Sequence, residues 1–232
     1  MNVFLIDIYF LYLLFKKIFL EKMKNTFIKC LLLSICLIFL IEITNKTLDL
    51  KGLLYNSLSD KLTNKQLKHI FELQDKWQWL SYFLMPILLL IKTSVIASTI
   101  YIGTFFFSKS PVTFKQLWGF VISAEFVFLL VPIFKIIWFY FFQTNYQLED
   151  IQNFYPLSAI NIVGYKDLEP WFVYPFQTLN LFEVAYWLIL AYYIGRATQT
   201  TMDNGLKIVA CSYGPTLLLW VVSIMFFALN YS

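Results

Sequence analysis

Charged residues are scarce in this sequence, and histidine is nearly absent. Asp, Glu, Lys and Arg make up only 14% of the 232 residues, whereas soluble domains carry about a quarter. The single histidine, His69, lies in a polar segment without Cys or His neighbours, which argues against a histidine-ligated metal or a haem. The formal net charge of +4 is a mild excess rather than a clustered basic surface, so we expect no nucleic-acid partner.

Motifs that carry catalysis or cofactor binding are also missing. The chain has no P-loop, no H-E-x-x-H, no G-x-S-x-G, no C-x-x-C and no glycine-rich dinucleotide fingerprint. Its three cysteines, Cys30, Cys36 and Cys211, lie inside apolar runs, where free cysteine packs as a small hydrophobe. We therefore expect a protein that is not an enzyme and that binds no cofactor and no metal.

Apolar and aromatic residues, in contrast, are abundant. Hydrophobic residues form 59% of the chain and aromatic residues 20%, which is more than one soluble core of this size would hold. In a lipid bilayer these side chains need no protein partner. The composition predicts an integral membrane protein of the cell (inner or plasma) membrane, with the lipid bilayer as its main partner.

Five segments are long and apolar enough to cross a bilayer, which takes about 20 residues: 27–44, 80–107, 117–142, 179–195 and 208–229. We predict an all-α, multi-pass protein in which these helices form one bundle over residues 27–232. Residues 1–26 form a basic cytoplasmic or interfacial segment. Its apolar start is an interfacial helix, an extra half-span, or the product of an upstream start codon, since the run from Met23 looks like an uncleaved signal anchor.

Orientation is predicted from the basic residues, which favour the cytoplasmic side. Nine fall on one side of this topology: Lys16, Lys17, Lys22, Lys24, Lys29, Lys109, Lys115, Arg196 and Lys207. Seven fall on the other side: Lys46, Lys51, Lys61, Lys65, Lys68, Lys76 and Lys166. Eight acidic residues share the second side: Asp49, Asp60, Glu72, Asp75, Glu149, Asp150, Asp167 and Glu169. The N-terminus is thus predicted to be cytoplasmic and the C-terminus external.

The two predicted external loops, 45–79 and 143–178, are long and differ in character. In the first, Thr63 is a plausible N-cap for an amphipathic helix over 65–76 that lies on the membrane surface beside Trp77 and Trp79. The second is rich in aromatic residues and poor in glycine, so we expect it to be ordered against the bundle or the bilayer. If a loop recognises a partner or a small ligand, this one is the best candidate, through Tyr155, Tyr165, Trp171 and Tyr174.

Four ionisable residues lie deep within the predicted spans: Lys92, Glu125, Lys135 and Glu183. They would be costly facing lipid, so we expect them to face the bundle. Depth along the helices pairs Lys92 with Glu125 and Lys135 with Glu183. Such pairs either fix the register of the helices or form an ion pathway, and we favour the structural role.

Prolines inside the spans predict helix kinks. Pro132 stands between Glu125 and Lys135 and removes a backbone hydrogen bond from the third span. Pro86 and Pro215 are candidates for kinks in the second and fifth spans.

The last third of the chain, LNLFEVAYWLILAYYIGRATQTTMDNGLKIVACSYGPTLLLWVVSI, has two apolar runs joined by a short basic turn. Over residues 179–229 it resembles the closing pair of spans of the Yip family, the Rab-interacting membrane proteins and their bacterial relatives. The resemblance implies a non-enzymatic scaffold that engages other membrane proteins, with no catalytic residues to carry over. Our leading hypothesis is a non-catalytic subunit or scaffold of a membrane complex. The alternative is a permease-like transport component that uses the four buried charges.

Overall fold

The computed structural model describes residues 26–231 apart from 60, 109 and 167, and this part of the chain is helical without any strand. The predicted N-terminal segment 1–26 lies outside the described residues, except for Thr26. The helices are α2 (Thr26–Thr47), α3 (Leu50–Ser59), α4 (Asn64–Phe107), α5 (Phe114–Glu125), the 3-10 turn η1 (Phe126–Leu129), α6 (Leu130–Phe141), α7 (Leu148–Asn153), α8 (Ile160–Val163), α9 (Pro170–Thr178), α10 (Leu181–Ala197) and α11 (Met202–Tyr231).

Within the described residues, four stretches of helix are long and apolar enough to cross a membrane: Thr26–Thr47, Asn64–Phe107, Phe114–Phe141 and Met202–Asn230. They correspond to the first, second, third and fifth predicted spans. The predicted fourth span is α10, which has 17 residues and is about 25 Å long at 1.5 Å per residue. This length lies at the lower limit for a crossing helix, so α10 is not among the four.

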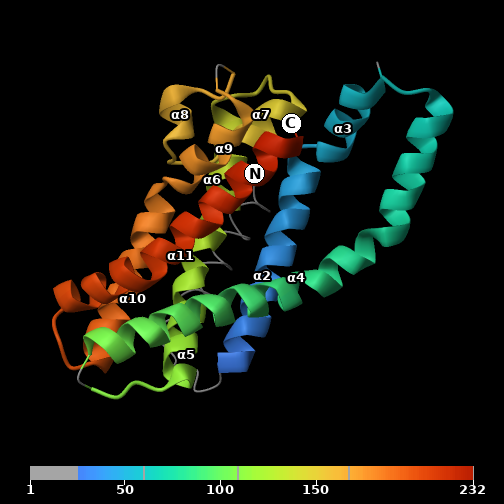
Figure 1. Cartoon of the computed structure of the whole chain (residues 1–232). Coiled ribbons are helices and arrows are strands. Elements are labelled where there is room, and N and C mark those ends of the chain that lie inside the picture. Colours follow the sequence, from blue (N-terminus) through green and yellow to red (C-terminus); the bar gives the residue numbers. More distant parts are fainter. Residues whose placement is uncertain (1–25, 60, 109, 167, 232) are drawn as a thin grey trace.

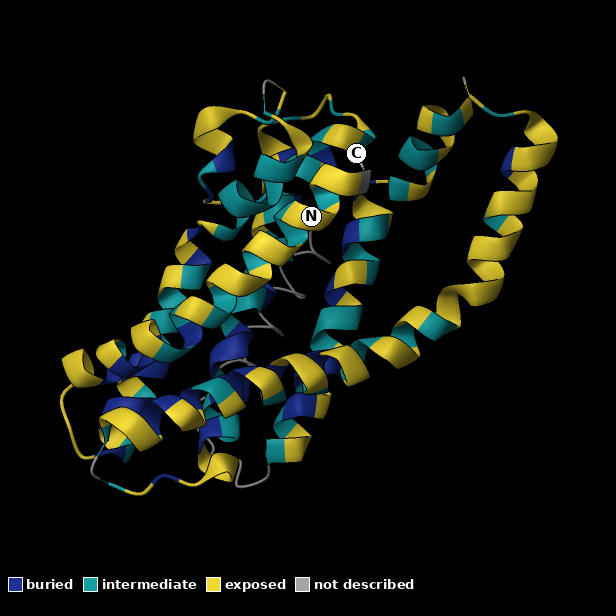
Figure 2. Cartoon of the chain, viewed as in Figure 1, coloured by how far each residue is buried: buried dark blue, intermediate teal, exposed yellow. Residues whose placement is uncertain are grey.

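Large apolar side chains cover the outside of the bundle. Phe105, Phe106 and Phe107 at the end of α4 are exposed, as are Leu219 and Phe226 on α11. Figure 2 shows both helices largely in the colour of exposed residues. In water this surface would be an aggregation hazard, whereas hydrocarbon accommodates it without cost.

The main core lies where α10 and α11 pack together with α4 and α5. Small residues let α10 and α11 approach closely. A Cβ added at Gly205 would overlap the carbonyl oxygen of Ala191, and one added at Gly195 would lie 2.8 Å from the carbonyl oxygen of Thr201. Both obstacles are backbone atoms, which cannot move aside as the end of a side chain can. The close approach of these two helices therefore requires glycine at both positions.

Helix α4 corrects one prediction from the sequence. Thr63 is the N-cap, as expected, and its backbone N–H and hydroxyl both donate to the Gln66 side chain. The helix that begins there does not end near Lys76 as a separate surface helix, but continues through the second span to Phe107. No residue between Lys76 and Pro86 breaks a helix, and a single proline is tolerated inside a membrane helix. Figure 1 shows α4 changing direction between its teal and its green part.

The first half of α4 stands away from the bundle and pairs with α3, whose Leu50 and Leu53 pack against the cluster of Leu48, Phe139 and Ile151 (Figure 1). We call residues 50–82 the arm. Lys51 and Asp75 form an ion pair of 2.9 Å within it, and the rings of Tyr55 and Phe71 lie 5.9 Å apart. The predicted external loop 45–79 is therefore largely helical.

The third span is interrupted directly before Pro132. The α-helix ends at Glu125, four residues form the 3-10 turn η1, and α6 then begins at Leu130. Pro132 has no N–H to bond the carbonyl of Phe128, and its ring crowds that carbonyl, so the preceding turn tightens. Pro86 and Pro215 lie inside α4 and α11, and both helices continue past them.

The helix ends form two groups (Figure 1). The end of α2, the end of α6, helices α7 to α9 and the C-terminus lie at one end of the bundle. The start of α5, the end of α4 and the turn between α10 and α11 lie at the other end. The second predicted loop is thus built from short helices that cap one end of the bundle.

Candidate functional site

An ion pair lies inside the helix bundle. Lys92 of α4 and Glu125 of α5 approach to 2.9 Å between Nζ and Oε2. The side chain of Glu125 is 4% exposed and that of Lys92 is 51% exposed. The ammonium group also lies 4.9 Å from the centre of the Phe128 ring. The structure thus brings together the two residues that helix depth pairs in the sequence, and the pair links α4 to α5.

Two buried oxygen atoms near this pair have no hydrogen-bond partner in the described part of the chain: Oε1 of Glu125 and the hydroxyl of Tyr186 on α10. The two groups lie near each other, but without the geometry of a hydrogen bond. Tyr186 is fully buried, and its ring packs against those of Phe128 and Tyr213 at 5.2 and 5.5 Å. An unsatisfied buried polar group costs about 1–3 kcal/mol, so such groups call for an explanation beyond packing.

Glu183 does not form the predicted pair with Lys135. Its Oε1 accepts hydrogen bonds from the hydroxyl of Tyr213 at 2.8 Å and from Nε1 of Trp187 at 3.0 Å. Glu183 is in the first turn of α10, where its backbone N–H is capped by Asn180 at 2.8 Å. Neutral donors and the helix N-terminus stabilise this carboxylate, which explains why it needs no lysine.

Lys135 is half-buried on α6 and makes no ion pair or hydrogen bond with any residue that the structure describes. It lies six residues before the end of α6 at Phe141, which is about 9 Å along the axis. The aliphatic part of the lysine side chain can extend toward the polar end of the helix. The ammonium group can then be solvated there without a carboxylate partner.

We call Lys92, Glu125, Glu183, Tyr186, Trp187 and Tyr213 the polar cluster. It joins α4, α5, α10 and α11 through the inside of the bundle. Sequence reasoning found its charges and missed its three aromatic members. The spacing of Glu183 from Tyr186 and Trp187 puts all three near one another on α10 and could have indicated them. Nothing local indicates Tyr213, which comes from another helix.

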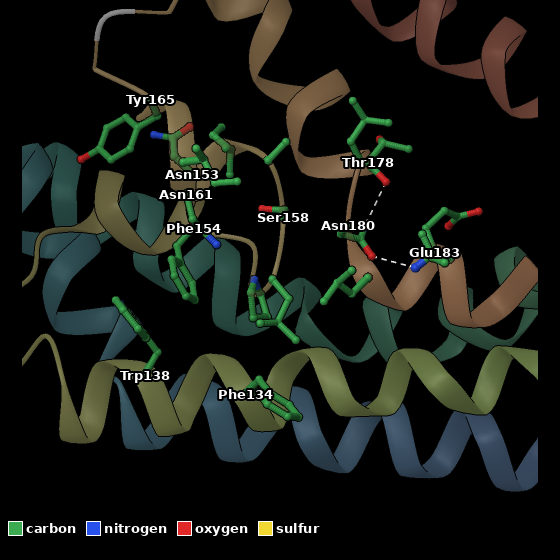
Figure 3. Close-up of a pocket in the computed structure, with 18 of the residues that line it drawn as sticks. Phe134, Trp138, Asn153, Phe154, Ser158, Asn161, Tyr165, Thr178, Asn180 and Glu183 are labelled. Atoms are coloured by element: carbon green, nitrogen blue, oxygen red, sulfur yellow. Dashed lines mark hydrogen bonds between the residues drawn. The ribbon is translucent and has the colours of Figure 1, made fainter.

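A pocket of about 1290 Å³ lies beside the polar cluster, at the end of the bundle that α7 to α9 cap. Figure 3 shows Phe134 and Trp138 of α6 directed toward the segment that carries Phe154, Ser158 and Asn161. Helix α10 lines the pocket through Leu181, Glu183, Val184, Trp187 and Leu188, and α11 lines it through Leu206 and Leu217. The pocket is lined mainly by apolar side chains with a few polar groups, as ligand sites commonly are.

The four aromatic residues predicted for an external interaction surface are engaged within the protein. The hydroxyl of Tyr174 accepts a hydrogen bond from Nε1 of Trp220 at 2.8 Å, and the carbonyl of Tyr155 accepts from Ser158 at 2.5 Å. Trp171 stacks on the neighbouring Phe172. Tyr165 alone lines the pocket.

Tyr165 and Asp150 form the polar edge of the pocket. The Tyr165 hydroxyl donates to Oδ1 of Asp150 at 2.6 Å, and the backbone N–H of Gln147 donates to Oδ2 at 2.8 Å. These two bonds hold the pKa of Asp150 below its ordinary value. The same contact favours the neutral phenol and raises the pKa of Tyr165 to about 12. The carboxylate is therefore charged at neutral pH.

Metal ligands do not gather in the described residues, where no group of three or more His, Cys, Asp or Glu could hold an ion. Comparison with known proteins finds no match to the chain among protein-family models, curated proteins or solved structures. The resemblance to the Yip family therefore stays a prediction.

Proposed function

We propose that this chain is a non-catalytic subunit or scaffold of a larger membrane complex, and that it engages a partner membrane protein through the arm. In this proposal the chain crosses the cell membrane five times, with a cytoplasmic N-terminus and an external C-terminus. The two groups of helix ends described above support five crossings, because successive ends alternate between the groups, and the distribution of the basic residues favours this sidedness. The arm and the pocket then lie on the external side.

The proposal rests on one observation: almost all side chains in the α4 half of the arm are exposed or only partly buried. In its α4 half, residues 64–82, Leu67 is the single buried side chain. A helix gains most of its stability from packing an apolar face, and this one packs only a narrow strip against α3. An arm with so little of its own core gains stability from a surface that covers it.

The free face of the arm is suited to a protein partner. Ile70, Leu73 and Trp77 are exposed and follow each other at helical spacing. They flank the buried Leu67 and are rotated away from Phe71, whose ring lies 5.9 Å from that of Tyr55 on α3. Exposed aromatic and aliphatic anchors next to charged residues are typical of the centre and rim of interfaces between proteins.

Site-specific photo-crosslinking in intact cells tests the proposal. A photoreactive residue at Leu73 or Trp77 is expected to give one discrete product that contains a second protein. The matched control is a photoreactive residue at Leu219 or Phe226, which are also apolar and exposed, on α11. A crosslink to lipid alone from the arm, or the same protein products from both helices, would overturn the proposal.

The polar cluster favours transport as a second candidate function. Lys92, Glu125 and Glu183 are ionisable, and two of the oxygens beside them are unsatisfied among the described residues. Intramembrane ionisable groups of this kind mark ion and proton pathways in other membrane proteins. The chain would then contribute the polar path of a transport system whose energy coupling resides in a partner.

Exchanging the charges of Lys92 and Glu125 distinguishes a structural role of this pair from a role in transport. The single changes Lys92→Glu and Glu125→Lys are expected to destabilise the protein, and the exchange of both restores the pair. If the exchanged protein is folded and supports growth or complex assembly like the wild type, the pair is structural. If it is folded but the cellular function stays lost, the transport candidate is favoured.

A further inference from the structure

The pocket is graded from polar to apolar along its length. At its outer end it is lined by Asn153, Ser158, Asn161 and Tyr165. Along α10 it is lined by Leu181, Val184 and Leu188, which recur at helical spacing and form one apolar strip. Farther along, Leu206 and Leu217 of α11 continue the strip. A site of this shape fits a molecule with a polar head and a long apolar tail.

The walls of the pocket provide stacking and apolar contact for such a tail. Phe134, Ile137 and Trp138 of α6 line the same cavity as the α10 strip. The pocket exceeds the range of roughly 300–1,000 Å³ that is typical of small-molecule sites. It therefore has room for a tail of many carbons in addition to a head group.

The polar end offers hydrogen-bond acceptors, and several of its donors are already used within the protein. The amide groups of Asn153 and Asn161 donate to the carbonyls of Glu149 and Tyr155, and the Ser158 hydroxyl also donates to Tyr155. The Tyr165 hydroxyl is used on Asp150. What these side chains leave for a ligand is mainly oxygen lone pairs, together with the second N–H of each amide.

The charged residues that line the pocket also favour a head group that is not anionic. Asp150 and Glu183 line the pocket, and none of the lysines and arginines that the structure describes does. Lys166 lies near Asp150, but it is exposed and outside the lining. Oε2 of Glu183 has no hydrogen-bond donor in the described part of the chain, since Tyr213 and Trp187 both bond Oε1. An anionic head would meet the Asp150 carboxylate at the polar end, and no cation among the described residues that line the pocket.

We propose that the pocket binds an amphiphile whose head donates hydrogen bonds and is neutral or cationic, namely a long-chain amine or an aminolipid. The head lies among Asp150, Asn153 and Asn161, and the tail runs along the Leu181, Val184 and Leu188 strip. This site is independent of the arm, so the inference holds or fails apart from the proposed scaffold function.

Native mass spectrometry of the full chain, purified in a non-ionic detergent, tests the proposal. The probes share a twelve-carbon chain and differ in head: dodecylamine, dodecanol and dodecanoic acid. Dodecylamine is expected to be retained at one molecule per chain, at least tenfold better than dodecanoic acid, with dodecanol between them. Equal retention of all three, or a preference for the acid, would overturn the proposal.

A variant that fills the cavity distinguishes the pocket from the general lipid-facing surface. Val184→Trp is expected to lower dodecylamine retention at least tenfold. Val222→Trp is the matched control, because Val184 and Val222 are 53% and 51% exposed and only Val184 lines the pocket. Equal retention of dodecylamine by both variants would show that it binds only the general lipid-facing surface, and would contradict the proposal.

The contact between the head group and Asp150 is tested by the ratio of two ligands retained by the same variant. A loss of folded protein lowers the retention of both ligands equally and leaves their ratio unchanged. Asp150→Asn is expected to lower the ratio of dodecylamine to dodecanol retained about fivefold, whereas Glu149→Gln, on the neighbouring carboxylate outside the lining, leaves it unchanged. An unchanged ratio in Asp150→Asn would contradict the head assignment. Dilauroyl phosphatidylethanolamine in place of dodecylamine identifies the source: its retention indicates a membrane aminolipid, and its rejection a free long-chain amine.

Discussion

Two ion pairs in this protein have the same length and differ in how far their carboxylates are buried. Lys92 and Glu125 in the bundle, and Lys51 and Asp75 in the arm, are each 2.9 Å apart. The Glu125 side chain is 4% exposed, whereas both side chains of the arm pair are 59% exposed. Distance alone therefore says little about what a pair contributes. The surroundings decide it, because burial removes the water that would otherwise solvate each charge.

The same contrast holds for the regions around the pairs. In the bundle, α10 and α11 approach so closely that Gly205 meets the backbone of Ala191. In the arm, the α4 half buries only Leu67. A change in the bundle must displace packed atoms, while a change in the arm meets solvent or a partner. The predictions below test this contrast, from the largest expected effect to the smallest.

Gly205→Ala is expected to have the largest effect. Its new methyl group would collide with the carbonyl of Ala191 and lie 2.9 Å from the backbone nitrogen of Gly195, so α10 and α11 must separate. Overpacking of this kind costs on the order of 3 kcal/mol. Gly119→Ala is the control, since the nearest obstacle there is the Thr26 side chain at 3.3 Å. Denaturant titration in detergent, followed by tryptophan fluorescence, measures both, and equal stabilities would refute the close packing.

Lys92→Met is expected to come next and to exceed Glu125→Gln. Removal of the lysine leaves a buried carboxylate without its counter-charge, which costs about 3 kcal/mol. Neutralising Glu125 leaves a lysine that is half exposed and can reposition its ammonium group. The same titration gives the order of the two variants. The reverse order, or two effects below about 0.5 kcal/mol, would show that the pair is screened like a surface pair.

Lys51→Met in the arm is expected to cost less than about 1 kcal/mol, because the pair is exposed on both sides. The effect should shrink further at 1 M salt, where screening acts over about 3 Å. Unfolding measured at low and high salt checks both statements. A loss as large as that of Lys92→Met would mean that the arm is covered in the purified protein and would remove the contrast.

The Asp150 and Tyr165 contact predicts a small pH dependence at the capped end of the bundle. The pKa of Asp150 is lowered on folding, so its contribution is present above the unfolded value of about 4 and is lost as pH falls below it. The pKa of Tyr165 is raised, so its contribution is present below the unfolded value of about 10 and is lost as pH rises through about 12.

Tyr165→Phe removes the shared hydrogen bond and should flatten both limbs of this profile. Thermal unfolding in detergent, scanned from acid to alkaline pH, measures the difference between the variant and the wild type. The control is Tyr140→Phe, an exposed tyrosine on α6. Parallel profiles for Tyr165→Phe and wild type would remove Asp150 as the cause.

Local pattern predicted the helices well because each depends on its own composition. Four predicted spans match helices that can cross a membrane, and Thr63 caps α4 as expected. The wrong prediction that a helix ends near Lys76 was made from local composition as well. Polar composition indicates where a helix leaves the hydrocarbon, but it does not end the helix when no residue breaks it.

The amino-acid sequence alone determined that this is a helical protein with a lipid-like exterior, and it placed four charges inside it. The tertiary structure decided what those charges meet. Lys92 reaches Glu125, while Glu183 takes Tyr213 and Trp187 in place of Lys135. The pocket, too, arises only where α6, α10 and the capping helices come together. The physical reason is that hydropathy and depth follow from residue order along one helix, whereas partners across helices depend on rotation and tilt, which only packing sets.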